Sequence, residues 1–351
     1  MASQAKPQTK PINLALQGGG AHGAFTWGVL DALLEDGRLT FEGISAASAG
    51  AMNAAVMAYG HNKGGAEKAR ELLEAFWSEI SQAGAFYRPV SQAWMPHTWA
   101  LDLQDSNAAM TSAFWQILSR YSPFNINPLN YNPIRGVLEK ILDCDTLRHC
   151  KAPQLFITAT NVRTGTPKIF TNKEMCIECL LASAALPYMF QPQEIDGEFY
   201  WDGGYMGNPS LWPLFYEARC RDILLVHVNP IVREEVPESG AEIENRLNEI
   251  TFNAALLKEL RAIDFVKKLL HEDMLKEHHK SRYKDILLHA IRTDDVMRGL
   301  SAASKFDTDW GFLCDLRDMG RAAAQDWLQK HFKNIGKSAS VDIQRDYLNI
   351  S

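Results

Sequence analysis

Two apolar segments near the N-terminus each run into a tight turn of small residues and then into a helical pattern. The first segment, residues 12–17, predicts a short buried strand that ends at three consecutive glycines. Residues 21–35 follow and are apolar on nearly every face, which is typical of a helix at the centre of a domain. Gly37 stands where a glycine commonly ends such a helix.

The second unit has the same order of elements. Residues 41–45 predict a strand, Ser48 lies in the turn, and residues 49–59 predict a helix of small residues that Gly60 ends. Because strand, turn and helix occur twice within sixty residues, the sequence predicts an α/β protein.

The rest of the chain continues this pattern and then becomes mainly helical. Further strands are predicted at residues 154–161, 222–228 and 286–291. Further helices are predicted at residues 66–83, 132–142, 241–280 and 310–332.

The length of 351 residues favours one large domain with an extension over two large domains. Residues 1–11 are predicted to form a disordered tail, residues 12–215 the main domain, and residues 216–351 the last core strands and a helical extension. Residues 84–131 are rich in tryptophan, phenylalanine and proline. Two interpretations of this insert stay open, an apolar cap over a cleft or an ordinary packed excursion.

Charge and cysteine content narrow the class of protein. A formal net charge of −6 argues against a nucleic-acid binder. The six cysteines are scattered, which favours a reducing compartment over a disulfide framework. Cys176 and Cys179 fall in a predicted helix and are interpreted as two plain thiols. Residues 1–11 lack the apolar core of a signal peptide, so we expect a cytoplasmic protein.

Ser48 is the first residue with a candidate chemical role. It lies between a predicted strand and a predicted helix, and its neighbours Ala46, Ala47, Ala49 and Gly50 are all small. A nucleophile elbow needs small neighbours because its backbone packs tightly against adjacent elements. The alternative is that Ser48 only caps the helix.

The glycine-rich turn, Gly18-Gly19-Gly20 followed by Gly23, fits two kinds of site. Bare backbone N–H groups could face a developing oxyanion. The same spacing also fits a dinucleotide-binding turn, which wants an acidic residue at the end of the second strand. That strand leads instead into Ser48, which favours the oxyanion interpretation.

Asp202 is the candidate base. Gly203 and Gly204 follow it, so the carboxylate lies at a tight turn, and an ordinary Asp-Gly turn is the alternative. Burial beside Trp201 would raise its pKa toward neutral and make it a useful base. His227, in a predicted strand, is the best candidate for a histidine partner, but a hydrogen-bonded core histidine is favoured there.

These motifs, in this order, resemble the patatin-like phospholipases of bacteria. The resemblance covers about residues 12–215 and includes residues 182–192, which are similar to the stretch before the family's catalytic aspartate. It implies a three-layer α/β/α fold with a mainly parallel central sheet. Near the C-terminus, the pattern around Ala302, Ser304, Lys305 and Phe306 looks like an extension of a subgroup, and no role is assigned to it.

The resemblance implies a Ser–Asp dyad that cleaves fatty-acyl esters without a histidine. Ser48 would be the nucleophile and Asp202 the base, with the oxyanion hole formed by the backbone of Gly18, Gly19 and Gly20. Two departures from the family pattern stand out. Ala46 replaces a glycine of the elbow, and His22 replaces an arginine or lysine of the glycine loop. Gly23, Gly50, Gly203 and Gly204 complete the motifs.

The expected partner is a lipid or another fatty-acyl ester, and transient contact with a membrane surface is left open. No cofactor, metal or nucleic acid is expected, and the sequence does not indicate an oligomeric state. Three alternatives remain: a non-catalytic lipid-binding scaffold of the same fold, an acyltransferase using the same site, and, more distantly, a dinucleotide-dependent oxidoreductase.

Overall fold

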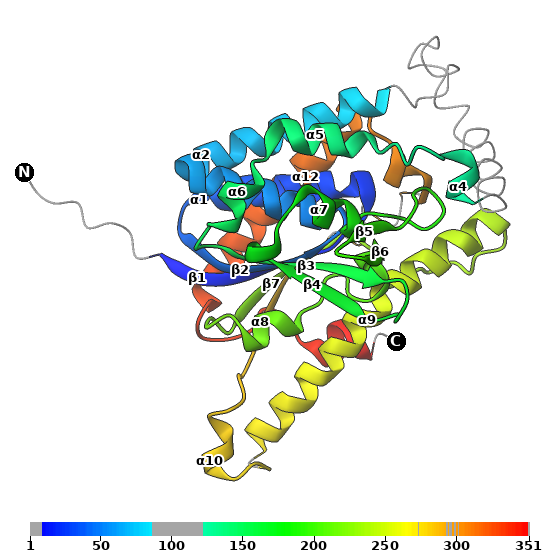
Figure 1. Ribbon diagram of the computed structural model, residues 1–351. Helices are drawn as coiled ribbons and strands as arrows, with labels where there is room; N and C mark the ends of the chain where they lie inside the picture. The colour runs from blue at the N-terminus through cyan, green and yellow to red at the C-terminus, as the bar shows by residue number, and fades with distance from the viewer. Residues whose placement is uncertain are drawn as a thin grey trace, which may run out of the picture.

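The computed structural model describes residues 9–85, 122–272 and 274–349, with positions 293, 295, 296, 298, 299 and 301 excepted. Most of the expected insert at 84–131 and of the expected tail at 1–11 therefore lies outside the described residues. The described part forms a mixed, mostly parallel sheet with helices on both faces, which confirms the predicted α/β class (Figure 1).

The sheet has the strand order β5-β6-β3-β2-β1-β7-β8, with β4 paired to β3. Strands β3, β2, β1, β7 and β8 are parallel to one another, whereas β4 and β6 run antiparallel to β3 and β5 runs antiparallel to β6. In chain order the strands are β1 (Lys10–Leu16), β2 (Leu39–Ala47), β3 (Gln154–Asn161), β4 (Pro167–Thr171), β5 (Gln193–Ile195), β6 (Glu198–Asp202), β7 (Asp222–His227) and β8 (Leu287–Arg292).

Helices cover both faces of this sheet. The α-helices are α1 (Gly23–Asp36), α2 (Ala49–Ala85), α4 (Pro123–Ile126), α5 (Pro133–Ile141), α6 (Cys144–Arg148), α7 (Ile177–Ser183), α8 (Trp212–Tyr216), α9 (Gly240–His271), α10 (Glu277–Lys280) and α12 (Trp310–His331). Short 3₁₀ segments are η1 (Gly20–His22), η3 (Asn172–Glu174), η4 (Gly203–Tyr205), η5 (Ala302–Phe306) and η6 (Phe332–Asn334), and η7 (Gln344–Leu348) is a π-helical turn. No helix in these stretches is both long and apolar enough to cross a membrane.

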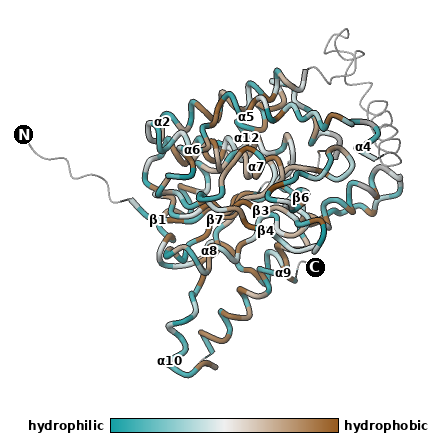
Figure 2. The backbone as a smooth tube through the Cα atoms, in the orientation of Figure 1, coloured by the Kyte–Doolittle hydropathy of each residue, from teal (hydrophilic) through white to brown (hydrophobic). Residues whose placement is uncertain are grey.

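Two separate cores form because side chains alternate across the strands. Leu14 and Leu16 of β1 pack with α1, α2, α5, α7 and α12 on one face. Ala15 of the same strand packs with α8 and α9 on the other face. Figure 2 shows the hydrophobic residues concentrated in the central strands between these two layers.

The predicted break at Gly60 is wrong. Helix α2 continues past it, and the chain bends at Gly64 and Gly65, where the backbone leaves the helical region. Gly60 is needed for packing instead, because a Cβ there would lie 2.5 Å from the Cα of Ala69. The two predicted helices at 49–59 and 66–83 are therefore the two arms of α2.

Three strands at one edge of the sheet, β4, β5 and β6, were not predicted. They are short and antiparallel, and most of their residues are partly exposed, so they lack the continuous apolar runs of β3 and β7. Cys176, expected inside a helix, is instead the N-cap of α7, and its sulfur accepts a hydrogen bond from the N–H of Cys179.

The C-terminal helix α12 packs closely along α1, and glycine permits this approach. A Cβ on Gly320 would overlap the carbonyl oxygen of Phe25, and one on Gly28 would overlap that of Arg317. Leu313, Leu316 and other apolar residues of α12 belong to the same core as β1 and α1. The C-terminal helix is therefore an integral part of the packed domain.

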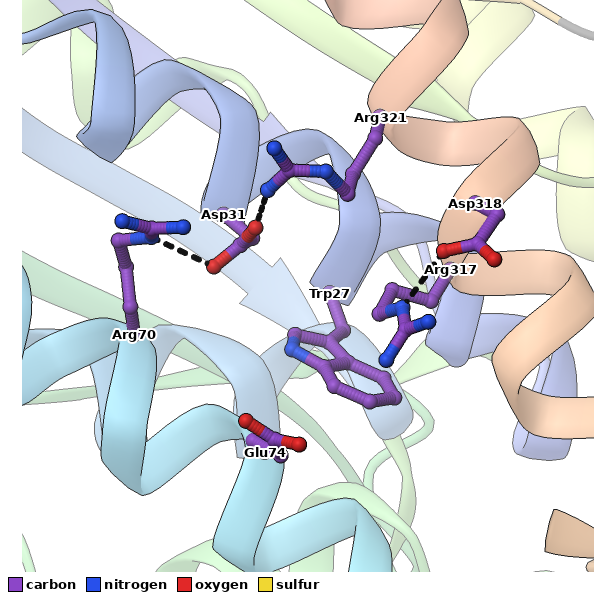
Figure 3. Close-up of a pocket in the computed structure, with 7 residues that line it drawn as sticks. All are labelled: Trp27, Asp31, Arg70, Glu74, Arg317, Asp318 and Arg321. Atoms are coloured by element: carbon purple, nitrogen blue, oxygen red, sulfur yellow. Dashed lines mark hydrogen bonds and ion pairs between the residues drawn. The ribbon is translucent and has the colours of Figure 1, made fainter.

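A cluster of ion pairs holds the outer side of this helix contact. Arg70 from α2 and Arg321 from α12 both bind Asp31 of α1 (Figure 3). Arg317 also lies over the ring of Trp27, 5.2 Å from its centroid. The pocket among these side chains is lined by three arginines and three acidic residues, so its charges balance. We interpret it as part of the packing interface between α1, α2 and α12.

The close contact of α1 with α12 predicts that Gly320→Ala destabilises the protein. The added methyl group has no space against the α1 backbone, and overpacking of this kind costs about 1–3 kcal/mol. Gly136→Ala on α5 is the matched control, because nothing lies within 4 Å of a Cβ there. It should stabilise the helix by about 0.5–1 kcal/mol. Urea unfolding measures both, and equal effects would contradict the packing account.

Candidate active site

Ser48 occupies a strained turn between β2 and α2. Its φ is 52°, in the left-handed region that residues other than glycine rarely adopt. Such a conformation costs about 1–3 kcal/mol and persists only where the surroundings enforce it. Ser48 is 8% exposed and directly precedes the first residue of α2. The geometry is that of a nucleophile elbow.

The small residues around Ser48 have different reasons to be small. A Cβ on Gly50 would overlap the carbonyl oxygen of Leu16 and lie 2.7 Å from that of Gln17, so this position requires glycine. A Cβ on Gly23 would lie 2.7 Å from the Cβ of Ala49. Ala46, in contrast, is fully buried and its methyl group packs in the main core. The elbow therefore tolerates alanine at this departure from the family pattern.

The C-terminal end of α7, which leads into a turn, fixes the elbow. The N–H of Ser48 lies 3.1 Å from the carbonyl oxygen of Ser183 and 2.9 Å from its Oγ. The Ser183 hydroxyl donates in turn to the carbonyl oxygen of Thr158 on β3, at 2.7 Å. Ser183 thus connects the strained serine to the centre of the sheet.

The same turn holds the candidate base. The N–H of Asp202 donates to the carbonyl oxygen of Ala185 at 2.9 Å. Asp202 is fully buried at the end of β6, and its Oδ1 accepts the N–H of Gly204 at 2.7 Å. A Cβ on Gly203 would overlap the carbonyl oxygen of Thr158, so the chain after Asp202 lies directly against β3.

The carboxyl group of Asp202 ionises near neutral pH, well above the usual range of an aspartate. Burial raises its pKa to about 7, the direction expected from its sequence surroundings. The Ser48 hydroxyl is close enough to lower this pKa in part. The Oδ2 atom of Asp202 nevertheless has no hydrogen-bond partner among the described residues. Together these observations place the hydroxyl beside the carboxyl group but not aligned on Oδ2.

The three glycines of the loop differ in what their amides do. The N–H of Gly18 already donates to Oδ1 of Asn208 at 2.6 Å, so it is not free to bind an oxyanion. No hydrogen bond from the N–H of Gly19 or Gly20 is found within the described part of the chain. A Cβ on Gly18 would lie 2.5 Å from that of Ser48, which places the loop directly against the elbow.

The two histidines named from the sequence are both buried and neutral. Burial lowers the pKa of His22 to about 3, and its Nε2 lies 2.7 Å from Oγ of Ser304. Burial also lowers the pKa of His227 to about 4. His227 faces Asn253 at 3.4 Å and Asp294 at 3.9 Å, so it is a core histidine on β7. Neither one is hydrogen-bonded to Ser48 in the described structure.

Sequence reasoning missed a group of amide side chains behind the glycine loop. Asn229 donates through Nδ2 to the carbonyl oxygen of Gly18 at 2.8 Å, and Gln17 accepts the N–H groups of Val228 and Asn229. The available signal was a polar residue directly after an apolar strand, as at Gln17 after β1 and Asn229 just beyond β7. The described residues contain no cluster of histidine, cysteine or acidic side chains that could hold a metal ion.

An α/β sheet with a serine at a strained elbow, beside a buried aspartate and a glycine loop, is an arrangement typical of serine hydrolases. The patatin-like phospholipase model matches residues 14–215, and the chain belongs to this family of lipid acyl hydrolases. Membership removes the dinucleotide-binding alternative. No curated protein matches the chain. Among solved structures, VipD from Legionella pneumophila is 16% identical, with a TM-score of 0.41 over 93% of this chain and 68% of that one.

The burial of Asp202 predicts that Asp202→Asn stabilises the protein above neutral pH. The folded state holds the proton up to about pH 7, whereas a free aspartate has a pKa of 3.8. Stability contributed by Asp202 is therefore present below pH 4 and is lost as pH rises through 7. Each pKa unit corresponds to about 1.4 kcal/mol, so the gain at pH 8 should approach about 4 kcal/mol.

Urea unfolding of both proteins between pH 4 and 8 measures this difference. The matched control is Asp196→Asn, at an exposed turn where φ is 52° and asparagine is tolerated. That change should shift stability little and without a trend in this pH range. A difference between wild type and Asp202→Asn that does not grow with pH would contradict the burial account.

Proposed function

We propose that the protein hydrolyses fatty-acyl esters of lipids through a Ser48–Asp202 dyad and an acyl-serine intermediate. The observation that carries this proposal is the pairing of a strained serine with a fully buried aspartate, both held by residues 183–185. Family membership supports a lipid ester as the substrate.

In the first step Asp202 takes the proton from Oγ of Ser48, and the resulting oxygen attacks the ester carbonyl carbon. A base is most effective when its pKa lies near the working pH, and burial gives Asp202 a pKa of about 7. The electron pair of the carbonyl bond moves onto its oxygen, which becomes a tetrahedral oxyanion.

The backbone N–H groups of Gly19 and Gly20 are the donors proposed for this oxyanion. A third donor is the N–H of Ala49, the first residue of α2, because the first amides of a helix lack an acceptor within it. One such donor is worth about 2.7–4 kcal/mol in the transition state. Gly18 is left out of the hole, because its amide is bound to Asn208.

The intermediate then collapses and the alcohol leaves with the proton held by Asp202. Fatty acid is released when Asp202 removes a proton from a water molecule that attacks the acyl-serine. The second tetrahedral intermediate collapses by breaking the bond to Oγ of Ser48, and Asp202 returns the proton to that oxygen. The enzyme thus returns to its starting state with no external cofactor. An alcohol in place of water at this step would make the same site an acyltransferase.

Ser48→Ala should abolish ester hydrolysis, because the acyl group then has no nucleophile to bind. The expected loss in kcat is at least about 1,000-fold, in line with serine removal in other serine hydrolases. Fatty acid released from a panel of phospholipids and simpler acyl esters measures it. Ser281→Ala, at an exposed turn after α10, is the matched control and should keep full activity. Full activity of Ser48→Ala would overturn the proposal.

Activity should rise with pH through the pKa of Asp202, since only its ionised form accepts the proton. We expect kcat/KM to rise about tenfold per pH unit below about 7 and to level off above it. A pH profile from 5 to 9 with a neutral acyl ester measures this limb. A profile that is flat between pH 5 and 8 would contradict the role of Asp202 as base.

A further inference from the structure

The 3₁₀ segment η5 lies on the glycine loop, although it is 87 residues or more beyond the region matched by the family model. A Cβ on Gly20 would overlap the carbonyl oxygen of Lys305. Oγ of Ser304, on the same segment, is hydrogen-bonded to His22 at 2.7 Å. A C-terminal segment therefore forms one wall of the candidate active site.

The ammonium group of Lys305 reaches two elements that surround the loop. It donates to Oδ1 of Asn229 at 3.0 Å and to Oδ1 of Asn248, on α9, at 2.9 Å. Asn229 in turn donates to the carbonyl oxygen of Gly18. One side chain thus joins α9 and the end of β7 to the first glycine of the loop.

The charge of Lys305 acts on the dyad as well. Burial is the main cause that lowers the pKa of Lys305 to about 8, so the group is mostly protonated at pH 7. Its positive charge lowers the pKa of Asp202 against the effect of burial, and Asp202 acts in return on Lys305. Phe252 lies between the two sites, with its ring 5.7 Å from Nζ of Lys305 and against Gly204.

The other charged groups around Lys305 are a glutamate and the two arginines that bind it. Glu249 on α9 attracts Lys305 and Arg233 repels Lys305. Glu249 is itself bound by Arg233 and Arg246, so its charge is already compensated. His22 is neutral, and Tyr205 beside Asp202 has its pKa raised by burial, so neither carries charge at pH 7. Lys305 is the cation whose charge acts on Asp202, and its carbonyl oxygen lies against Gly20 of the loop.

We propose that Lys305 is a positioning residue of the active site, which holds the glycine loop through Asn229 and keeps a positive charge within electrostatic reach of Asp202. This inference rests on the proposed dyad. Its charge favours the ionised base and the oxyanion alike, since both are negative. Through Asn229 it holds the carbonyl of Gly18, and this fixes the orientation of the peptide that carries the N–H of Gly19.

Lys305→Met tests the proposal, with Lys305→Arg as the variant that keeps the charge. In Lys305→Met, kcat/KM at pH 7 should fall about 10- to 100-fold, the usual cost of a displaced catalytic geometry. The limb of the pH profile assigned to Asp202 should also move to higher pH, because the ionised carboxylate loses its nearby cation. Lys305→Arg should keep that limb close to its wild-type position. If Lys305 only supported folding, its replacement would not shift this limb of the pH profile.

Lys267→Met is the matched control. Lys267 also lies on a packed surface, where its Nζ binds Asp285 at 2.8 Å and the carbonyl oxygen of Ile286 at 2.9 Å. The Lys267→Met variant should be less stable than wild type, but the pH profile of its activity should not shift. If Lys305→Met does not fold, as judged by thermal melting, Lys305→Gln replaces it, since glutamine keeps a donor without the charge.

Ser48→Ala is measured alongside to separate the two proposals. An active Ser48→Ala enzyme would overturn the proposed function itself. Suppose instead that Ser48→Ala is inactive, while an uncharged Lys305 variant keeps the wild-type pH profile and activity within twofold of wild type. That result would overturn only the role of Lys305. A shifted profile in the uncharged variant, restored by arginine, would support it.

Discussion

The candidate site depends on residues 183–185, at the end of α7, which bind both Ser48 and Asp202. Ser183 accepts the N–H of Ser48, and Ala185 accepts the N–H of Asp202 two residues further on. A strained serine stays strained only if its surroundings hold it, and Ser183 does so by linking it to β3. Because residues 183–185 hold both residues, their separation is set by backbone hydrogen bonds together with the buried hydroxyl of Ser183.

The second constraint is the burial of Asp202, which lowers stability above neutral pH and gives the carboxylate the pKa that the proposed base requires. An exposed aspartate would be ionised at neutral pH but a poor base, whereas burial raises its pKa to about 7. The N–H of Gly204 and the positive charge of Lys305 stabilise the buried carboxylate and partly offset its desolvation. The C-terminal region therefore contributes to the site as well as to the core, where α12 packs on α1.

The sequence predicted those helix ends that depend on the backbone preferences of a single residue. Gly37 does end α1, with a φ of 68°, and Pro133 does open α5. It did not predict what depends on contacts between distant segments. Strands β4, β5 and β6 lack apolar runs, and Gly60 and Gly50 are required by neighbours that only folding brings close. The amide of Gly18 is bound by Asn208, about 190 residues away in the sequence, and Lys305 packs on Gly20 from about 285 residues away. No local sequence pattern predicts contacts between residues so far apart.

The most direct measurement of the central claim is the position of a covalent adduct. A fluorophosphonate reacts only with an activated serine, and peptide mass spectrometry locates the modified residue. The account predicts one adduct, on Ser48, that forms in the folded wild-type protein and is strongly reduced in Asp202→Asn. An adduct on another residue, or equal labelling of Ser48 in folded wild type and Asp202→Asn, would contradict a dyad of these two residues.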